Sequence, residues 1–342
     1  MSDMEQFKAE MERRTKEIEQ IIEPYLPEET GHQKTVLEAM NYSMKAGGKR
    51  LRPMLMQEVC RLFTGDVLDC VIPFMAAVEM IHTSSLVHDD LPCMDDDRLR
   101  RGKPSTWAEY GEDIGVLTGD ALMMYAFETA ARAFETSIDP DEISAIGRSI
   151  GILAHKTGAF GMIGGQTVDV ELAGSDIPRD KLDFIYRLKT GALLEASMLI
   201  GAVLGGAAEE DCKIVERLAS HIGMAFQIQD DLLNLVGTKE AKEKDYRSDI
   251  TEGKRTLVVV HALQNTTKRE RLVEILSSKE TDPAILEEAV STMREAGSID
   301  YARAYAEKLT ANAQERLAKI LPESKMRDLL ASMADWFVDR LK

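Results

Sequence analysis

An apolar helical run ends in the stretch Val87-His88-Asp89-Asp90-Leu91-Pro92-Cys93-Met94-Asp95-Asp96-Asp97-Arg98-Leu99-Arg100-Arg101-Gly102-Lys103-Pro104. Five aspartates within nine residues repel one another, so this stretch predicts a bound cation. Aspartate oxygens without His or Cys at zinc-ligand spacing favour a hard divalent ion, Mg²⁺ before Ca²⁺. A solvated acidic helix end is the alternative for this stretch taken alone.

A second acidic motif lies far away in the sequence, in Phe226-Gln227-Ile228-Gln229-Asp230-Asp231-Leu232-Leu233-Asn234. It again places two adjacent aspartates at the end of an apolar helical run. Two such helix ends facing each other across a cavity would hold a cluster of Mg²⁺ ions, with a polyphosphate bridging them. The repetition therefore favours a metal and diphosphate site over two solvated helix ends.

The chain resembles the all-trans (E-type) polyprenyl diphosphate synthases, the family that includes farnesyl and geranylgeranyl diphosphate synthases. The resemblance covers nearly the whole chain and rests on six motifs in order: Gly47-Gly48-Lys49-Arg50-Leu51-Arg52-Pro53, the DDxxxxD pattern of Asp89 to Asp95, Gly164-Gly165-Gln166, Lys189-Thr190-Gly191, the Asp230-Asp231 pair and Gly253-Lys254-Arg255-Thr256. It implies an all-α fold, a large isoprenoid synthase helical bundle around a central active-site cavity.

Composition supports one large helical domain over residues 1–342. No Pro/Gly/Ser-rich linker divides the chain, and 44% hydrophobic residues with only 6% aromatic residues suit helix packing better than sheets. We expect a peripheral N-terminal helix within 1–30 and scaffold helices over 257–342. Hydrophobic periodicity and Pro/Gly punctuation predict further helices over 33–46, 73–89, 116–133 (buried), 140–155, 181–204 and 216–235.

Charge and cysteine usage limit the partners and the compartment. The formal net charge of -17 argues against nucleic acid as a partner, and it requires metal to reverse the local sign before a diphosphate approaches the aspartates. Cys60, Cys70, Cys93 and Cys212 form no CxxC pair, which predicts a reducing, cytoplasmic setting. The polar N-terminus and the lack of an apolar run of membrane-spanning length predict no signal peptide and no membrane span.

Three cations follow the glycine pair, at Lys49, Arg50 and Arg52. Such a cluster taken alone is usually solvated surface. The resemblance implies that Lys49, Arg52, His82 and Arg101 hold the diphosphate of isopentenyl diphosphate. A second diphosphate site away from the metals needs fixed positive charge of its own, which agrees with this assignment.

The resemblance also implies the metal and allylic-diphosphate sites. It assigns three Mg²⁺ ions, with Mn²⁺ as a substitute, to Asp89, Asp90, Asp95, Asp230 and Asp231. It assigns the allylic diphosphate to Arg100, Lys189, Thr190, Gln227, Lys244 and Lys254. The helix of Lys189 is expected to break at Thr190-Gly191, so that carbonyl dipoles stabilise a developing carbocation, and Lys244 and Lys254 are expected to close over the phosphates.

Product length is expected to depend on Ile81, Ser84 and Ser85 on the helix that precedes Asp89. In the family the growing chain runs beside this helix, and many bacterial farnesyl synthases carry an aromatic residue at the position of Ser84. Its absence favours a C20 over a C15 product. A small polar pair is otherwise most often a close-packing site.

Three positions depart from the family pattern. The family usually has an Asp where this chain has Arg98, a His where it has Trp107 and a third Asp where it has Asn234. The first two are not metal ligands in the family, so we expect altered substrate binding with activity retained. The Asn234 amide carries no charge, so one ion is expected to bind more weakly.

The sequence thus predicts a Mg²⁺-dependent homodimeric prenyltransferase that joins an allylic diphosphate to isopentenyl diphosphate head to tail, with no side-chain general base. The alternatives are a farnesyl or a longer-chain synthase, a terpene cyclase, a noncatalytic subunit of a two-protein synthase, and a glycosidase-like pair of carboxylates. The cationic second site argues against a cyclase, and adjacent aspartates argue against a glycosidase.

Overall fold

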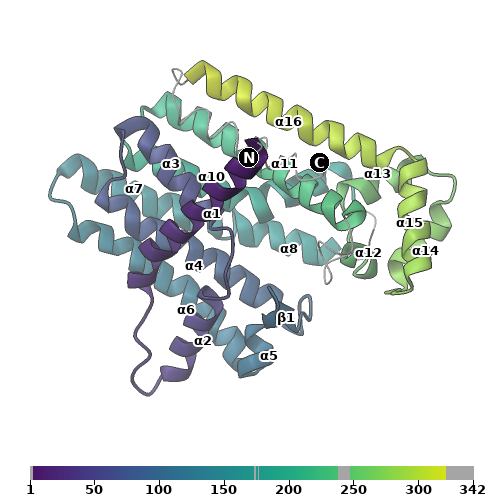
Figure 1. The fold of residues 1–342 in the computed structure, drawn as a ribbon, viewed down its shortest axis with the longest axis horizontal. Coiled ribbons are helices and arrows are strands. Elements are labelled where there is room, and N and C mark those ends of the chain that lie inside the picture. The colour runs from purple at the N-terminus through teal and green to yellow at the C-terminus, as the bar shows by residue number, and fades with distance from the viewer. Residues whose placement is uncertain (1–2, 173–174, 176, 238–246, 321–342) are drawn as a thin grey trace. The chain divides into compact units, whose positions relative to one another are not determined.

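The computed structural model describes residues 3–172, 175, 177–237 and 247–320, and this part of the chain is helical (Figure 1). The helices are α1 Asp3–Ile22, η1 Glu23–Tyr25, α2 Lys34–Met44, α3 Leu51–Thr64, η2 Asp69–Val71, α4 Ile72–Asp89, α5 Thr106–Tyr110, α6 Glu112–Ala131, η3 Arg132–Glu135, α7 Pro140–Thr157, α8 Met162–Leu172, α9 Arg179–Ile185, η4 Tyr186–Gly191, α10 Ala192–Leu204, α11 Glu209–Val236, α12 Ser248–Thr251, α13 Leu257–Asn265, α14 Arg269–Ser277, α15 Pro283–Glu295 and α16 Ser298–Ile320. Two short strands, β1 Leu99–Arg100 and β2 Lys103–Pro104, pair antiparallel. The expected all-α class is confirmed.

The fold divides into two compact units. Unit 1 comprises Met1–Ala154 and Ala196–Cys212, and unit 2 comprises His155–Glu195 and Lys213–Lys342. The boundaries fall inside α7, α10 and α11, so neither unit is one continuous segment of chain. The prediction of one domain over 1–342 stays a prediction, and each unit is described below by itself.

Helix α4 is the core element of unit 1. Pro73 lies in its first turn, where a missing N–H costs nothing, and Phe74, Met80 and Ile81 are fully buried. Helix α6 packs closely against it, because a Cβ at Gly119 would lie 2.1 Å from His88 Nε2. Ser84 Oγ donates to the Gly119 carbonyl at 2.9 Å, which joins the two backbones at the same point.

Helix α6 is less buried than the sequence predicts. The exposed fractions of Val116, Leu117 and Met124 are 40%, 54% and 70%. The expectation of a buried helix over 116–133 is therefore wrong for one face. Helical periodicity locates an apolar stripe but cannot tell whether the chain itself covers it.

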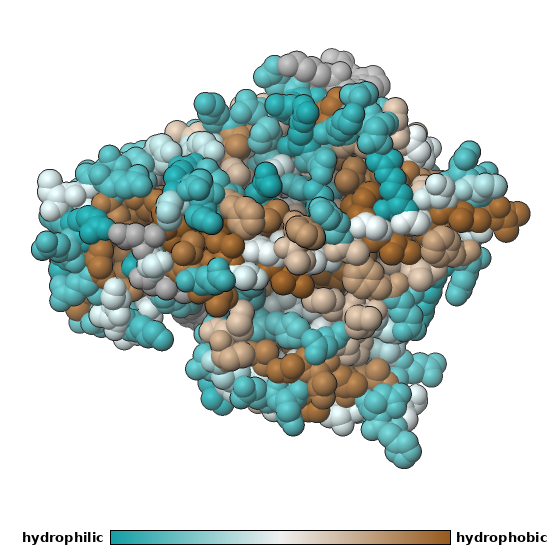
Figure 2. Space-filling view, turned by 180° about the vertical axis from the view of Figure 1, so that it is seen from behind, coloured by the Kyte–Doolittle hydropathy of each residue, from teal (hydrophilic) through white to brown (hydrophobic). Residues whose placement is uncertain are grey.

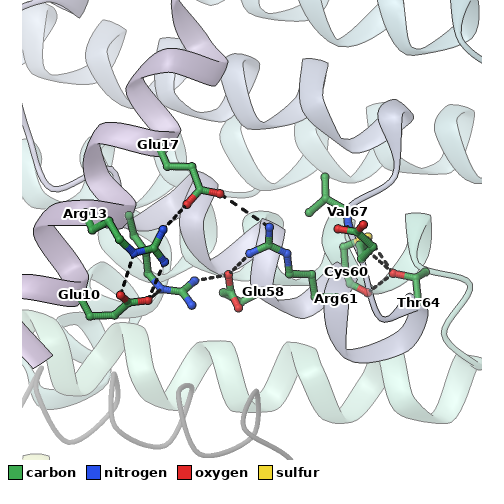
Figure 3. A network of polar contacts seen from close by, with 10 residues as sticks. Glu10, Arg13, Glu17, Glu58, Cys60, Arg61, Thr64 and Val67 are labelled. Carbon is green, nitrogen blue, oxygen red and sulfur yellow. Dashed lines mark hydrogen bonds and ion pairs between the residues drawn. The ribbon is translucent and has the colours of Figure 1, made fainter.

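Helix α1 packs along α3 in unit 1 and is held by ion pairs (Figures 1 and 3). The fully buried Glu58 carboxylate of α3 accepts from Arg14 of α1 and, at 2.9 Å, from Arg61. Arg13 joins the network through Glu10 and Glu17. Because a buried carboxylate without partners is costly, these guanidinium groups fix α1 to the unit. A helix is thus present within residues 1–30, where the sequence predicts one, and it ends at Ile22.

Unit 2 has its own hydrophobic core. Ile228, Leu232 and Leu235 of α11 belong to one buried cluster with residues of α13, α14, α15 and α16. Within the described residues this C-terminal part is helical up to Ile320, as expected, and residues 321–342 lie outside them.

One sequence-based expectation about membranes needs correction. The segment Asp69–Asp89 is long and apolar enough to cross a membrane by length and composition, although 78% of the apolar window is buried inside the protein. Burial of α4 in the core of unit 1 accounts for its apolar character.

The surface drawn in Figure 2 is not uniformly polar. Brown hydrophobic patches interrupt the teal hydrophilic surface on this face. Exposed apolar side chains of the described residues also include Phe160, just before α8, and Ile163 and Val170 within α8.

Candidate functional site

Backbone hydrogen bonds fold the first aspartate motif into a compact loop at the end of α4. The amide of Asp95 donates to the Asp89 carbonyl at 2.9 Å, and the amide of Asp97 donates to the Asp90 carbonyl at 3.1 Å. The backbone thus brings Asp89, which is half-buried, beside Asp95, which is exposed. These two aspartates can present oxygens to one cation.

Asp90 lies differently from its neighbour. It is 2% exposed, and Arg100 Nε donates to its two oxygens at 3.0 and 3.2 Å, with a further bond from Nη2. Burial raises the pKa of Asp90, and the hydrogen bonds from Arg100 oppose that rise. The predicted metal ligand Asp90 and the predicted phosphate-binding Arg100 are therefore bonded to each other.

The β1–β2 hairpin positions the second arginine. Its two turn residues, Arg101 and Gly102, have φ of 53° and 81°, as the tight hairpin turn with two left-handed residues requires. Arg101 Nη1 donates to the Gly47 carbonyl, and a Cβ at Gly48 would lie 2.8 Å from the same Nη1. Gly48 thus provides the space for this guanidinium group.

Three of the four predicted isopentenyl diphosphate residues lie in one positive field. Burial lowers the pKa of His82 well below its usual value, and the charges of Arg52 and Arg101 lower it further. Burial also lowers the pKa of Arg52 to about 10, which leaves it charged at neutral pH. The fourth residue, Lys49, is exposed.

Sequence reasoning missed how this positive cluster is held. Arg50 is 6% exposed with φ of 49°, and it donates to Glu79 Oε1 at 2.7 Å and to the Met44 carbonyl at 2.6 Å. The buried Glu79 also acts on Arg52, because its charge raises the pKa that burial lowers. The available sequence signal was a lone Glu within the apolar run of residues 72–81 of α4.

Two departures from the family pattern touch each other. The guanidinium of Arg98 lies 4.9 Å from the centre of the Trp107 ring, at cation–π distance. Trp107 Nε1 donates to the Asp97 carbonyl at 2.9 Å. Together they brace the loop that carries Asp95.

Lys189 lies in a turn of π-helix, η4, between α9 and α10. The predicted break at Thr190-Gly191 is thus an extra residue in the helix rather than an open end, a form common at functional sites. Lys189 Nζ pairs with Asp169 Oδ2 at 2.5 Å. Helix α8 approaches this turn so closely that a Cβ at Gly165 would lie 2.2 Å from the Lys189 amide.

Hydrogen bonds link η4 to α11 in unit 2. Thr190 Oγ1 donates to Gln227 Oε1 at 2.7 Å, and Gln227 Nε2 donates to Asp231 Oδ1 at 2.8 Å. Tyr186 Oη donates to Asp231 Oδ2. Burial raises the pKa of Asp231 well above its usual value, as does the charge of Asp249.

Asp230 is exposed, unlike its neighbour Asp231, which is 6% exposed. Asp249 lies close enough for the charge of Asp230 to act on it, and its pKa rises to about 6 because of burial, with Lys254 opposing. Lys254 pairs with Asp249 at 3.5 Å and with Glu252 at 2.6 Å. The predicted residue Lys244 lies outside the described residues.

Asn234 holds the backbone after the second motif. Its Nδ2 donates to Ser248 Oγ at 2.9 Å, and its Oδ1 accepts from the Asp249 amide at 3.2 Å. It is 6% exposed. The amide thus joins α11 to α12, a role that the expectation of a weakened ion site did not include.

The predicted chain-length residues share one region of α4. Ile81 and Ser84 are fully buried, whereas Ser85 is half-buried and donates to the His82 carbonyl at 2.8 Å. Ser84 faces Gly119 of α6, so close packing and a role in product length coincide at this position.

The donor chemistry fits a hard divalent ion. Asp89, Asp95 and Asp230 offer carboxylate oxygens at or near the surface, and Mg²⁺ completes its shell with water and substrate phosphate. Among the described residues, no three His, Cys, Asp or Glu side chains are gathered as a metal site by themselves.

Known proteins resemble the chain over most of its length. The family described as Polyprenyl synthetase matches residues 33–293. A chloroplastic geranylgeranyl pyrophosphate synthase of Catharanthus roseus is 41% identical over 84% of this chain and 69% of its own, and a farnesyl diphosphate synthase of Geobacillus stearothermophilus is 40% identical over 68% and 77%.

Solved structures agree. A geranylgeranyl pyrophosphate synthetase from Pyrococcus horikoshii covers 99% of this chain and 100% of its own at 32% identity with a TM-score of 0.88. A polyprenyl synthase from Caulobacter crescentus, complexed with calcium and isoprenyl diphosphate, covers 98% and 97% at 25% identity with a TM-score of 0.81.

The Arg98–Trp107 contact generates a stability prediction. Trp107→Leu removes the aromatic ring and the donor to the Asp97 carbonyl, and Arg98→Ala removes the cation, so each should lower the free energy of unfolding by at least about 0.5 kcal/mol. In urea denaturation, the double variant should lose less unfolding free energy than the sum of the losses in the two single variants. Arg303→Ala, on the partly exposed face of α16, is the control and should change stability little. Additive losses would contradict the contact.

Proposed function

Since the chain belongs to the polyprenyl synthetase family and is a short-chain trans-prenyltransferase, we propose that it extends an allylic diphosphate with isopentenyl diphosphate to geranylgeranyl diphosphate. The observation that supports the proposal is that the chain offers two different settings suited to a diphosphate. Exposed aspartates suit a metal-bound diphosphate, and the Arg52, His82 and Arg101 cluster suits a diphosphate bound without metal.

Members of this family are metal-dependent, and the Caulobacter relative holds calcium. We assign three Mg²⁺ ions, replaceable by Mn²⁺, to Asp89, Asp95 and Asp230. Bound Mg²⁺ supplies positive charge to the departing diphosphate. We assign no ion to Asp90 and Asp231, because their oxygens already accept hydrogen bonds. Asp90 accepts from Arg100, and Asp231 accepts from Tyr186 and Gln227.

The remaining residues bind and orient the allylic substrate. Lys189 and Thr190 lie in the π-helical turn, where the extra residue frees backbone carbonyls to face developing positive charge. Asp169 holds Lys189 in place until phosphate replaces it. We propose that two further cations, Lys254 and Lys244, close over the substrate phosphates.

Product length follows from the small residues of α4. Ser84 lies fully buried against Gly119 of α6, and an aromatic side chain at this position would be far bulkier than the serine. Farnesyl diphosphate is the second candidate product, favoured by the 40% identity to the farnesyl diphosphate synthase of Geobacillus stearothermophilus.

We also propose that two copies of the chain associate through α6. Leu117, Ala121 and Met124 recur along one face of this helix, and an adjoining cavity of about 440 Å³ is lined mostly by apolar side chains of α2 and α6. An apolar stripe of this kind suits a partner helix of the same sequence better than water.

A reducing, cytoplasmic setting fits the four cysteines, all of which are free thiols in the structure. The relative from Catharanthus roseus is chloroplastic, so the compartment is our proposal.

Loss of either proposed metal-binding carboxylate, Asp89 or Asp230, should abolish turnover. Asp89→Ala and Asp230→Ala should each lower kcat by at least about a thousandfold, because a diphosphate then meets uncompensated negative charge. Radiolabelled isopentenyl diphosphate with Mg²⁺, and with EDTA in parallel, measures this. Asp300→Ala, an exposed aspartate of α16, is the control. Wild-type rates in either variant would refute the metal assignment.

Ser84→Tyr should shorten the product. Incubation of the protein with isopentenyl diphosphate and each of the C5, C10 and C15 allylic diphosphates, followed by product sizing, should give C20 for the wild type and C15 for the variant. Ser84→Ala, which removes only the hydroxyl, should keep the C20 product. An unchanged product length in Ser84→Tyr would show that other residues limit chain growth. A cyclase would release hydrocarbon from an allylic diphosphate alone, and a noncatalytic subunit would release no product.

Leu117→Asp with Met124→Asp should convert a dimer to a monomer, because burying two carboxylates without partners costs several kcal/mol. Sedimentation velocity at micromolar concentration checks this. Ile143→Asp, at a 40% exposed position of α7, is the matched control and should remain dimeric. A monomeric wild type at these concentrations would contradict the proposed association.

A further inference from the structure

Tyr186 connects three elements of unit 2 through its hydroxyl group. It is the first residue of η4 and is 6% exposed. Its Oη donates to Asp231 Oδ2 of α11 and accepts from the amide of Leu257, the first residue of α13, at 2.8 Å. The hydroxyl therefore has a donor and an acceptor on two different helices.

The bonds form a circuit that returns to the same turn. From Tyr186 it passes through Asp231 and Gln227 to Thr190, four residues after Tyr186. Both Asp231 oxygens thus accept from protein groups inside the unit. A Mg²⁺ ligand needs a lone pair facing water or phosphate, which the exposed neighbour Asp230 offers and the buried Asp231 does not.

The turn is also packed tightly on two sides. A Cβ at Gly165 of α8 would lie 2.2 Å from the Lys189 amide, and a Cβ at Gly223 of α11 would lie 2.9 Å from Gly191 Cα. Glycines place the backbones at this distance, but they provide no directional bond. The directional bonds between η4 and α11 at this point come from the circuit.

We propose that Tyr186 and Asp231 are a positioning pair for the reaction: Asp231 is not a metal ligand but holds η4, with Lys189 and Thr190, in register with Asp230. The pair rests on the proposed prenyl transfer. It acts through Thr190 and Gln227 and touches neither substrate nor metal.

The pair predicts which kinetic parameters change. Tyr186→Phe leaves the Leu257 amide and one Asp231 oxygen without their partner, so the turn loses its register while the metal-binding carboxylate remains. We expect kcat to fall at least tenfold. The half-saturating Mg²⁺ concentration and the KM for isopentenyl diphosphate should stay within twofold of wild type.

Asp231→Asn tests the second member against its neighbour. It keeps one acceptor oxygen and the side-chain volume, so it should fold, lower kcat at least tenfold and leave the half-saturating Mg²⁺ concentration within twofold. Asp230→Asn should raise that concentration at least tenfold. The double variant Tyr186→Phe/Asp231→Asn should be no slower than the slower single variant, because both changes break one circuit.

The experiment measures kcat, both KM values and Mg²⁺ titrations, with urea midpoints to show that each variant is folded. Tyr301→Phe is the control, because Tyr301 of α16 accepts from Arg179 through its hydroxyl yet lies outside the circuit. A tenfold higher Mg²⁺ requirement in Asp231→Asn, additive losses in the double variant, or a wild-type kcat in Tyr186→Phe would each overturn the pair.

Failure of the proposed function has a different signature. It appears in the wild-type protein, as absence of any condensation product with all three allylic diphosphates, and the positioning pair is then withdrawn with it. Failure of the pair alone leaves wild-type condensation intact and changes only the variants.

Discussion

The geometry of a helix decides what an adjacent pair of aspartates can do. Successive side chains project about 100° apart around the axis, so two neighbours cannot face the same side. In both motifs the second aspartate turns into the protein, where Asp90 meets Arg100 and Asp231 meets Tyr186 and Gln227. The first aspartate remains at or near the surface. In each pair, therefore, one carboxylate lies at or near the surface and the other is held by hydrogen bonds inside the protein.

The same division of roles governs the positive charges. Burial and the charges of the neighbouring arginines lower the pKa of His82, and such a cluster needs a counterion inside the protein. Glu79 of α4 supplies it: Glu79 binds Arg50, and its charge opposes the lowering by burial of the pKa of Arg52 and of Arg101. Fixed charges are thereby partly compensated before substrate arrives, which limits the cost of assembling them.

Close backbone approach is the third constraint. Gly48 makes room for the Arg101 guanidinium, Gly119 lets α6 approach α4, and Gly165 lets α8 approach the π-helical turn. In each case the neighbour is a residue of the site or of its supporting helix. A glycine within helical sequence indicates that another backbone or side chain packs closely against it. Which group packs there depends on segments far away in the chain.

Local pattern was sufficient for much of this protein. Helix positions, the all-α class and the two aspartate motifs follow from periodicity, from Pro and Gly punctuation and from charge density, all of which act over a few residues. The six ordered motifs also identified the family, because their residue types and their order are specific even where their spatial relation is unknown.

Tertiary structure decided the roles inside each motif. The bond from Arg100 to Asp90, the stacking of Arg98 on Trp107 and the use of Asn234 to hold α12 all join residues whose separation in sequence carries no sign of contact. Exposure of one α6 face was likewise invisible, since an apolar stripe reads the same whether the chain or a partner covers it. Sequence determined which chemical groups are present, and folding decided which of them remain available, because hydrogen bonding and burial are set by neighbours that only the folded chain brings together.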